Sequence, residues 1–145
     1  MVTLNEHLLS LKCPHSLVLL FHSLAHATQH ISGHLRNDSV TQLRSRNKFG
    51  DTQLSVDVIA DTIVFEHLKS SKVVSFASSE ENSNVISINS SFADSHHFYS
   101  VTFDPLDGSS IIDANFAVGS IFSIWPSTSK CKLITLSNIT HCKSI

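Results

Sequence analysis

Two aspartates, a glycine and two serines stand directly behind a β-rich run of this chain. Residues 98–103 are Phe-Tyr-Ser-Val-Thr-Phe, which predicts a strand, and residues 103–110 are Phe-Asp-Pro-Leu-Asp-Gly-Ser-Ser. Asp104 and Asp107 stand three positions apart around a proline, which stiffens the backbone of the turn expected there. Such a turn can direct both carboxylates, and the Leu106 carbonyl between them, at one hard cation such as Mg²⁺.

The next three residues, Gly108, Ser109 and Ser110, suit an anion. A glycine lets the backbone approach a ligand closely, and the serines offer N–H and O–H donors, to which a helix starting here would add its positive N-terminal end. The same residue types are common in turns and at helix N-caps, so this composition alone leaves a purely structural interpretation open. With the aspartates before them, they indicate a combined site for a cation and a phosphate.

The literal sequence of residues 103–116 resembles the signature of the Mg²⁺-dependent sugar bisphosphatases, the family of fructose-1,6-bisphosphatase and sedoheptulose-1,7-bisphosphatase. Two further segments match in order and spacing: residues 47–60 resemble the family's Gly-Asp loop and the helix after it, and residues 79–81 resemble its paired glutamates. Ile111 and residues 122–126 are more similar to the sedoheptulose bisphosphatases, since fructose bisphosphatases usually place Asn where Ile111 stands.

The resemblance implies an α/β layered fold, αβαβα in the complete family, of which this chain would contain the N-terminal helices and part of the first sheet. Residues 1–126 are expected to form a partial N-terminal metal-binding domain, and residues 127–145 a divergent tail. One metal ligand and the contacts to the sugar lie in the family's second half, so an incomplete chain is expected, without activity by itself. The full-length family is expected to form homo-oligomers.

The resemblance also implies the role of each site residue. The implied metal ligands, for two or three Mg²⁺ ions or for Mn²⁺, are Glu80, Asp104, Asp107 and, through its carbonyl, Leu106. The implied catalytic residues are Asp57 and Glu81, which would orient and deprotonate the attacking water, and Asp51, in a mobile loop over the metals. The implied ligands of the scissile phosphate are Gly108, Ser109 and Ser110. The implied reaction is Mg²⁺-dependent hydrolysis of a phosphate ester of sedoheptulose-1,7- or fructose-1,6-bisphosphate in carbohydrate metabolism.

Two other functions stay open. An inositol-monophosphatase-like enzyme would share the Glu-Glu pair and the Asp-Pro-x-Asp-Gly string, but usually has Thr where Ser109 stands. A truncated, non-catalytic remnant that acts as a binding or interaction module would fit a chain that matches only the front part of the family.

Acidic residues are concentrated in the middle of the chain. Ten of the twelve lie in residues 51–113 together with only two lysines, so this segment has a formal charge of −8 in a chain of net charge −2. Carboxylates crowded in this way repel one another unless they are solvated or share bound cations. A solvated acidic face is the simple interpretation for Asp61, Glu66 and Asp94.

Other partners and compartments are less consistent with this sequence. The apolar run at residues 16–21 is far shorter than the ~20 residues that cross a bilayer, so no membrane association is expected. A pI near 6.5 and a single short basic cluster at residues 44–48 argue against nucleic acid as a partner. Three cysteines without a metal-type spacing indicate a reducing compartment, and we expect the cytoplasm rather than a plastid.

Hydrophobic periodicity predicts a first long helix at residues 16–36, where apolar side chains recur at three- and four-residue steps. Beside this stripe, His22, His26, His30 and His34 stand at strict four-residue spacing. Such a ladder could chelate a transition metal, but a site of this kind usually needs a third ligand from elsewhere, so a polar helix face is the preferred interpretation.

A second helix is expected to begin at Asp51 or Thr52 and to end near Lys69. Its predicted buried face consists of Leu54, Val58, Phe65 and Leu68. Asp57 lies beside that face, where an aspartate is more often a surface residue, although a partly buried one could act as a proton acceptor. The predicted strands are residues 72–77, 98–103 and 115–125, and the predicted polar segments are a loop at 37–50 and a loop or loose hairpin at 82–97.

Overall fold

The computed structural model describes residues 2–37, 42–46, 52–82, 84–89, 98–114 and 117–127. Its helices are α1 (Leu4–Ser10), α2 (His15–Asn37), α3 (Ser55–Ser71) and a short 3₁₀ helix, η2 (Ser109–Ala114). Its strands are β1 (Gln42–Arg46), β2 (Thr52–Leu54), β3 (Val74–Ser79), β4 (Ile86–Ser87), β5 (Tyr99–Asp107) and β6 (Gly119–Pro126). Within these ranges no helix has the length and apolar character needed to cross a membrane.

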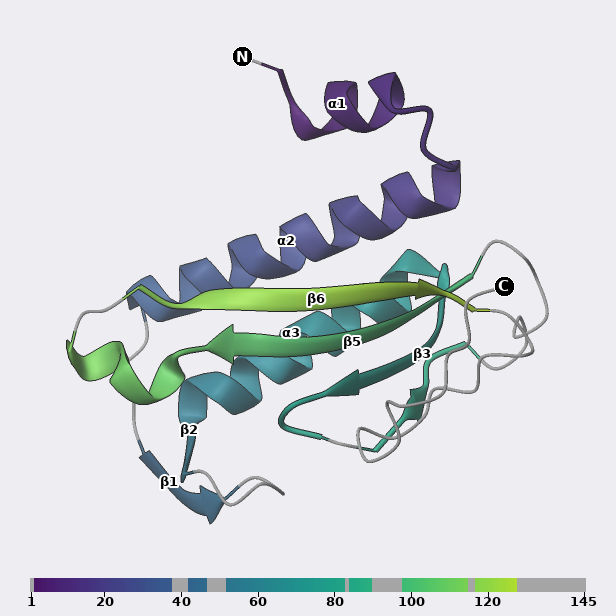
Figure 1. Cartoon of the computed structure of the whole chain (residues 1–145). Helices are drawn as coiled ribbons and strands as arrows, with labels where there is room; N and C mark the ends of the chain where they lie inside the picture. Colours follow the sequence, from purple (N-terminus) through teal and green to yellow (C-terminus); the bar gives the residue numbers. More distant parts are fainter. Residues whose placement is uncertain are drawn as a thin grey trace.

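The larger sheet is mixed, with the strand order β4-β3-β5-β6. Strands β3 and β5 are parallel, with Ala77 opposite Val101 and Ser79 opposite Phe103, whereas β4 and β6 each run antiparallel to their neighbour. Strands β1 and β2 form a separate antiparallel pair, and Figure 1 shows them apart from the larger sheet. Because β3 and β5 are parallel, their carboxyl ends lie at the same edge of the sheet, which is where such sheets present ligands.

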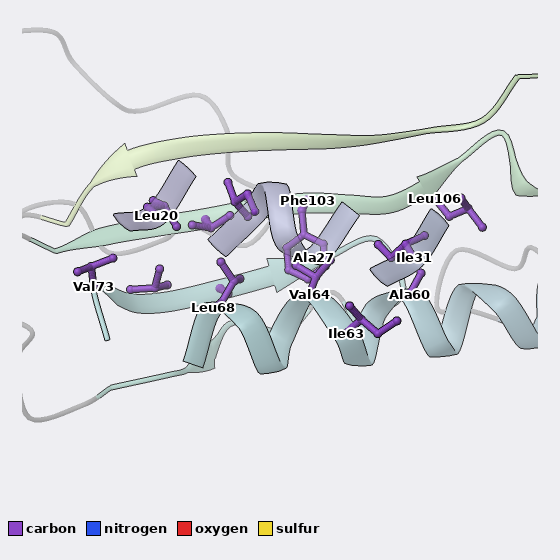
Figure 2. Packing of buried hydrophobic residues seen from close by; sticks show 14 of the residues in the cluster. Leu20, Ala27, Ile31, Ala60, Ile63, Val64, Leu68, Val73, Phe103 and Leu106 are labelled. Carbon is purple, nitrogen blue, oxygen red and sulfur yellow. The ribbon is translucent and has the colours of Figure 1, made fainter. Parts of the chain in front are cut away.

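One hydrophobic cluster joins α2 and α3 to the sheet (Figure 2). Ala27 on α2 and Ala60 on α3 are buried in it, and side chains of a single methyl allow two helices to pack closely. Phe65 and Phe103 meet edge to face with ring centroids 5.1 Å apart, which connects α3 to β5. The other fully buried apolar members are Leu20, Val64, Leu68, Val74, Ala77 and Val101. Burial of these side chains holds the helical layer against the strands that carry the candidate site.

Of the two predicted long helices, the first is confirmed and the second needs correction. The first long helix is confirmed to within one residue at each end. The second begins at Ser55 rather than at Asp51 or Thr52, because Thr52–Leu54 pairs with β1 instead of entering the helix. The prediction that Val58 is buried was wrong: it is 40% exposed, since the core face of α3 runs through Val56 and Ala60.

The short helix α1 was not predicted, although its start carries a recognisable signal. The Thr3 hydroxyl accepts a hydrogen bond from the Glu6 backbone N–H, and the Glu6 carboxylate accepts one from the Thr3 N–H at 2.8 Å. This Thr-x-x-Glu arrangement is a capping box, which satisfies donors that the first turn of a helix leaves open. The helix is only seven residues long, too short for hydrophobic periodicity to reveal it.

Several strand predictions needed correction. The loop predicted at 37–50 contains β1 in its described part, because Gln42–Arg46 finds its hydrogen-bonding partner in β2. The strand predicted at 72–77 lies two residues later, after Lys72, which adopts a left-handed conformation with φ of 57°. In the described part of 82–97, β4 pairs antiparallel with β3, as a hairpin would. The strand predicted at 115–125 corresponds to β6, which begins later than predicted, at Gly119, and ends at Pro126.

The core assignment leads to a test with two adjacent leucines of α2. Leu20 is fully buried and Leu19 is 40% exposed. We expect Leu20→Ala to lower the free energy of unfolding by about 2–5 kcal/mol, because it leaves a cavity, and Leu19→Ala to lower it by less than about 1 kcal/mol. Urea denaturation followed by circular dichroism measures both. Equal losses in the two variants would contradict the placement of the core.

Candidate metal and phosphate site

The carboxyl ends of β3 and β5 bring two acidic segments together. Ser79 lies opposite Phe103 in the parallel pair, and the backbone N–H of Glu80 donates to the Phe103 carbonyl at 3.0 Å. Glu80 and Asp104 are therefore the next residues along two neighbouring strands. The sheet thus brings together two predicted metal ligands that lie far apart in the sequence, as the parallel arrangement requires.

A tight turn fixes the backbone that carries Glu80 and Glu81. The Ser79 hydroxyl accepts a hydrogen bond from the Asn82 N–H at 2.9 Å, and the Ser79 N–H donates to the Asn82 carbonyl at 3.2 Å. The Ser78 hydroxyl donates to the same carbonyl at 3.4 Å. Glu80 is exposed and Glu81 is half-buried, so the turn presents the two carboxylates to different surroundings.

Asp104, Leu106 and Asp107 lie in a strand, where the sequence predicted a turn. Asp104 is opposite Ile121 and Asp107 is opposite Gly119, so β5 carries one more residue than β6 across this interval, which is a β-bulge. Pro105 has no N–H for the ladder, and the Asp104 carboxylate accepts the N–H of Leu106 at 3.0 Å. The bulge redirects the backbone at the point where the predicted ligands stand.

Gly108 turns the chain from β5 into η2. Its φ of 85° lies in the left-handed region, which glycine adopts without a steric penalty. The Gly108 carbonyl then accepts the N–H of Ile111 at 3.1 Å as the 3₁₀ helix begins. Ser109 is half-buried and Ser110 is exposed in this first turn. A short 3₁₀ helix thus begins at these serines.

The first two turns of α3 supply two more carboxylates. Asp57 is only 3% exposed, so it is not the surface residue that an aspartate at such a position more often is. Asp61, one turn later, has a buried Oδ1 atom without a hydrogen-bond partner. Burial raises the pKa of the Asp61 carboxyl, and hydrogen bonding with the Ser79 side chain opposes that rise. The prediction that Asp61 belongs to a solvated face was therefore wrong, whereas Glu66 is exposed as predicted.

These side chains form an oxygen-rich edge rather than a closed cage. Over the ranges the structure describes, no three acidic, histidine or cysteine side chains have their donor atoms already gathered around one point. The carboxylates and the Leu106 carbonyl are hard oxygen donors, which is the chemistry that Mg²⁺ prefers, so the donor set fits this ion. Asp51 lies outside the described residues, as does Asp94.

Two contributors to this edge were missed by the sequence analysis. Asp61 stands four residues after Asp57 and so shares its side of α3, a spacing that was readable from the sequence. Ser79 is followed three residues later by Asn82, and its role in shaping the glutamate turn depends on the end of β3. Neither role follows from residue type alone, because serine and aspartate are also ordinary turn residues.

Comparison with known proteins identifies similar chains. Residues 2–143 match the family described as the fructose-1-6-bisphosphatase N-terminal domain. The chain is 44% identical over 104 residues to a chloroplastic sedoheptulose-1,7-bisphosphatase of Chlamydomonas reinhardtii, covering 72% of this chain and 25% of the relative. It is 35% identical over 133 residues to a class 1 fructose-1,6-bisphosphatase of Geotalea uraniireducens, covering 92% of this chain and 41% of the relative.

Solved structures show the same relationship. A fructose-1,6-bisphosphatase of Leishmania major in holo form superposes with a TM-score of 0.78 at 28% identity, over 93% of this chain and 42% of the other. A putative sedoheptulose-1,7 bisphosphatase of Toxoplasma gondii superposes with a TM-score of 0.74 at 34% identity, over 86% and 37%. The chain thus spans between about a quarter and two fifths of the length of these relatives. The N-terminal helices and part of the first sheet expected from the resemblance are confirmed.

The buried carboxyl of Asp61 leads to a pH-dependent prediction. Because its folded-state pKa is raised, the stability it contributes is complete at low pH, below its unfolded pKa, and is lost as the pH rises through the folded value. We expect Asp61→Asn to raise the free energy of unfolding at pH 7 relative to the unchanged chain, and to do so less at pH 4. Urea denaturation at both pH values tests this, with the exposed Glu66→Gln as the control on the same helix. A variant less stable than the parent at pH 7 would show that the hydrogen bonding of Asp61 outweighs its desolvation.

Proposed function

The chain belongs to the fructose-1,6-bisphosphatase family, and we propose that it carries the metal and phosphate site for Mg²⁺-dependent hydrolysis of a phosphate ester of a sugar bisphosphate. The observation that carries the proposal is the meeting of Glu80, at the end of β3, with the bulged Asp104–Asp107 segment of β5. The relatives with similar sequences are named as sedoheptulose-1,7- and fructose-1,6-bisphosphatases, which supports the substrate class.

The charge of this edge explains why a cation is needed. A phosphate monoester carries negative charge, and it would have to approach a segment whose formal charge is −8. Glu80, Asp104, Asp107 and the Leu106 carbonyl would hold Mg²⁺, with Mn²⁺ as a substitute, since all are oxygen donors. Bound there, the ions would neutralise charge on the transferring phosphoryl group and favour formation of a water nucleophile.

The remaining residues would then position water and phosphate. Asp57 and Glu81 would accept the proton of the attacking water at their carboxylate oxygens, a role that the burial of Asp57 supports. The backbone at Gly108 and the hydroxyls of Ser109 and Ser110 would hydrogen-bond the scissile phosphate. Asp51 would belong to the segment that closes over the site.

Two finer assignments follow the same reasoning. Ile111, which is 46% exposed at the start of η2, supports a sedoheptulose bisphosphate over a fructose bisphosphate, because the latter enzymes usually have Asn at this position. A cytoplasmic protein and a homo-oligomeric complete enzyme remain our proposals, and the plant-type relatives are themselves named as chloroplastic.

A binding role without catalysis is the second candidate function. Strand β6 pairs with β5 on one side, and in the described sheet it is the last strand in the order. Ile121 and Trp125 on this strand are 55% and 51% exposed. An edge strand with exposed large apolar side chains is suited to pairing with another chain or another segment.

Metal binding by the proposed ligands can be measured without any substrate. At a Mg²⁺ or Mn²⁺ concentration of about ten times its Kd, preferential binding to the folded chain should raise the free energy of unfolding by about 1.4 kcal/mol. We expect Asp104→Asn to remove most of this gain, and the exposed Glu66→Gln on α3 to keep it. Thermal unfolding with and without the metal tests both variants, and an undiminished gain in Asp104→Asn would remove Asp104 from the ligand set.

Hydrolysis itself is tested in a fusion with the part of a relative that this chain does not cover. Alone, the chain is expected to release no phosphate from sedoheptulose-1,7- or fructose-1,6-bisphosphate above background. Joined to the remaining residues of the Chlamydomonas relative, it should hydrolyse at least one of them, and Asp57→Asn should lower kcat/KM by about 10²–10⁴-fold. If a folded fusion kept its full activity in the Asp57→Asn and Asp104→Asn variants, the proposed roles would be overturned. A fusion that hydrolyses neither substrate but forms a stable complex with another chain would favour the binding function.

A further inference from the structure

Three histidines from two helices meet where α2 packs against α3. His26 and His30 stand one turn apart on α2, and His67 stands on α3. The His30 Nδ1 and His67 Nε2 atoms are 3.2 Å apart and share a hydrogen bond. The ring centroids of His30 and His67 are 4.8 Å apart and those of His26 and His67 are 6.4 Å apart, both edge to face. We call these three side chains the histidine seam.

The packing of the helices explains why the three rings meet. His26 and His30 each directly precede a buried core residue of α2, and His67 directly precedes the fully buried Leu68 of α3. All three rings therefore lie beside the buried contact between the helices. His26 and His30 are exposed and His67 is half-buried, so a dissolved ion can reach the rings while the core beneath holds the helices in place.

The spacing of the His30–His67 pair suits a metal ion. In a tetrahedral zinc site, ligand nitrogens ~2.0–2.1 Å from the metal lie about 3.3–3.4 Å from each other. The observed separation of 3.2 Å between His30 Nδ1 and His67 Nε2 is close to this value. A small movement of the two rings would therefore allow a metal to replace the proton that the nitrogens now share.

His26 is placed to act as a third ligand. Its four-residue separation from His30 puts both rings on one side of α2, a spacing at which two imidazoles can share a metal. As the rings stand, no three such donors in the described ranges surround a common point. The exposed His26 would turn about its side-chain bonds to complete the set, and water would occupy the fourth position.

The surroundings of His67 favour its neutral ring, and one nearby carboxylate attracts cations. Burial lowers the pKa of His67, and the neighbouring His30 and His26 lower it further, while Glu66 opposes them. The neutral ring is the form that binds a metal. Glu66 is exposed on α3 directly beside His67, and its carboxylate attracts a cation to the seam.

We propose that His26, His30 and His67 form a site for a divalent transition metal such as Zn²⁺, which links α2 to α3. Nitrogen ligands favour such ions over Mg²⁺, which prefers oxygen. The seam is separate from the acidic edge, because His67 and Asp57 stand ten residues apart on α3, or about 15 Å along the helix axis. The two sites would therefore select different ions.

The experiment titrates Zn²⁺ alone into the chain by calorimetry, with Mg²⁺ present in large excess to occupy the acidic edge. We expect His67→Gln and His30→Gln each to weaken Zn²⁺ binding at least about tenfold, which corresponds to about 1.4 kcal/mol. His26→Gln should weaken it as well. His15→Gln, an exposed histidine at the start of the same helix, is the matched control and should leave binding unchanged.

Thermal unfolding in a chelator establishes that each variant is folded, and thermal unfolding in Zn²⁺ shows whether the metal stabilises it. Loss of the Zn²⁺-dependent increase in melting temperature in His30→Gln and in His67→Gln would support a bridge between the helices. Binding that survives both substitutions, or that depends on His26 and other α2 histidines but not on His67, would overturn the proposal.

Discussion

The parallel pairing of β3 with β5 is the constraint on which the candidate site depends. It brings residues near positions 80 and 104 to the same edge. The hydrogen bond from the Glu80 N–H to the Phe103 carbonyl extends the pairing one residue beyond the end of β3. Parallel strands cannot be joined by a tight turn, so this placement depends on packing rather than on local sequence. The buried contacts of Val101 and Phe103 with the helical layer hold β5 in the register that the site needs.

The same edge contains a conflict between stability and charge. Asp57 and Asp61 occupy the first two turns of α3, and both are withdrawn from water to different degrees. Withdrawal from water disfavours an ionised carboxyl, which is why burial raises the pKa of Asp61 even though hydrogen bonding with Ser79 opposes that rise. The hydrophobic cluster beneath supplies the stability that offsets this cost. Bound cations would reduce the repulsion between these carboxylates, so the unfavourable charges are consistent with a cation-binding role.

Local patterns in the sequence were sufficient to predict an element whose structure depends mainly on its own residues. The long apolar stripe predicts α2 almost to the residue, and the β-rich run predicts the start of β5. Local patterns failed where the structure of a segment depends on pairing with a segment distant in the sequence. The β1–β2 pair takes Thr52–Leu54 out of the predicted helix, and pairing with β6 carries β5 through Pro105 as a bulge. The literal signature was the basis for predicting Asp104 and Glu80 as ligands, yet it did not show that they would be neighbours across two strands.

The histidines show the same dependence on a distant partner. A four-residue ladder on one helix offers two adjacent imidazoles at a time, and the sequence gives no sign of which other element lies beside it. His67 stands 37 positions after His30, and only the packing of α3 on α2 brings their nitrogens to hydrogen-bonding distance. The two ends of α3 differ in the ligand atoms near them. Its first turns lie beside oxygen donors, which suit a hard ion, and its last turns carry an imidazole, which suits a transition-metal ion of intermediate softness. One helix thus connects an oxygen-rich environment with an imidazole-rich one, because its two ends face different neighbours.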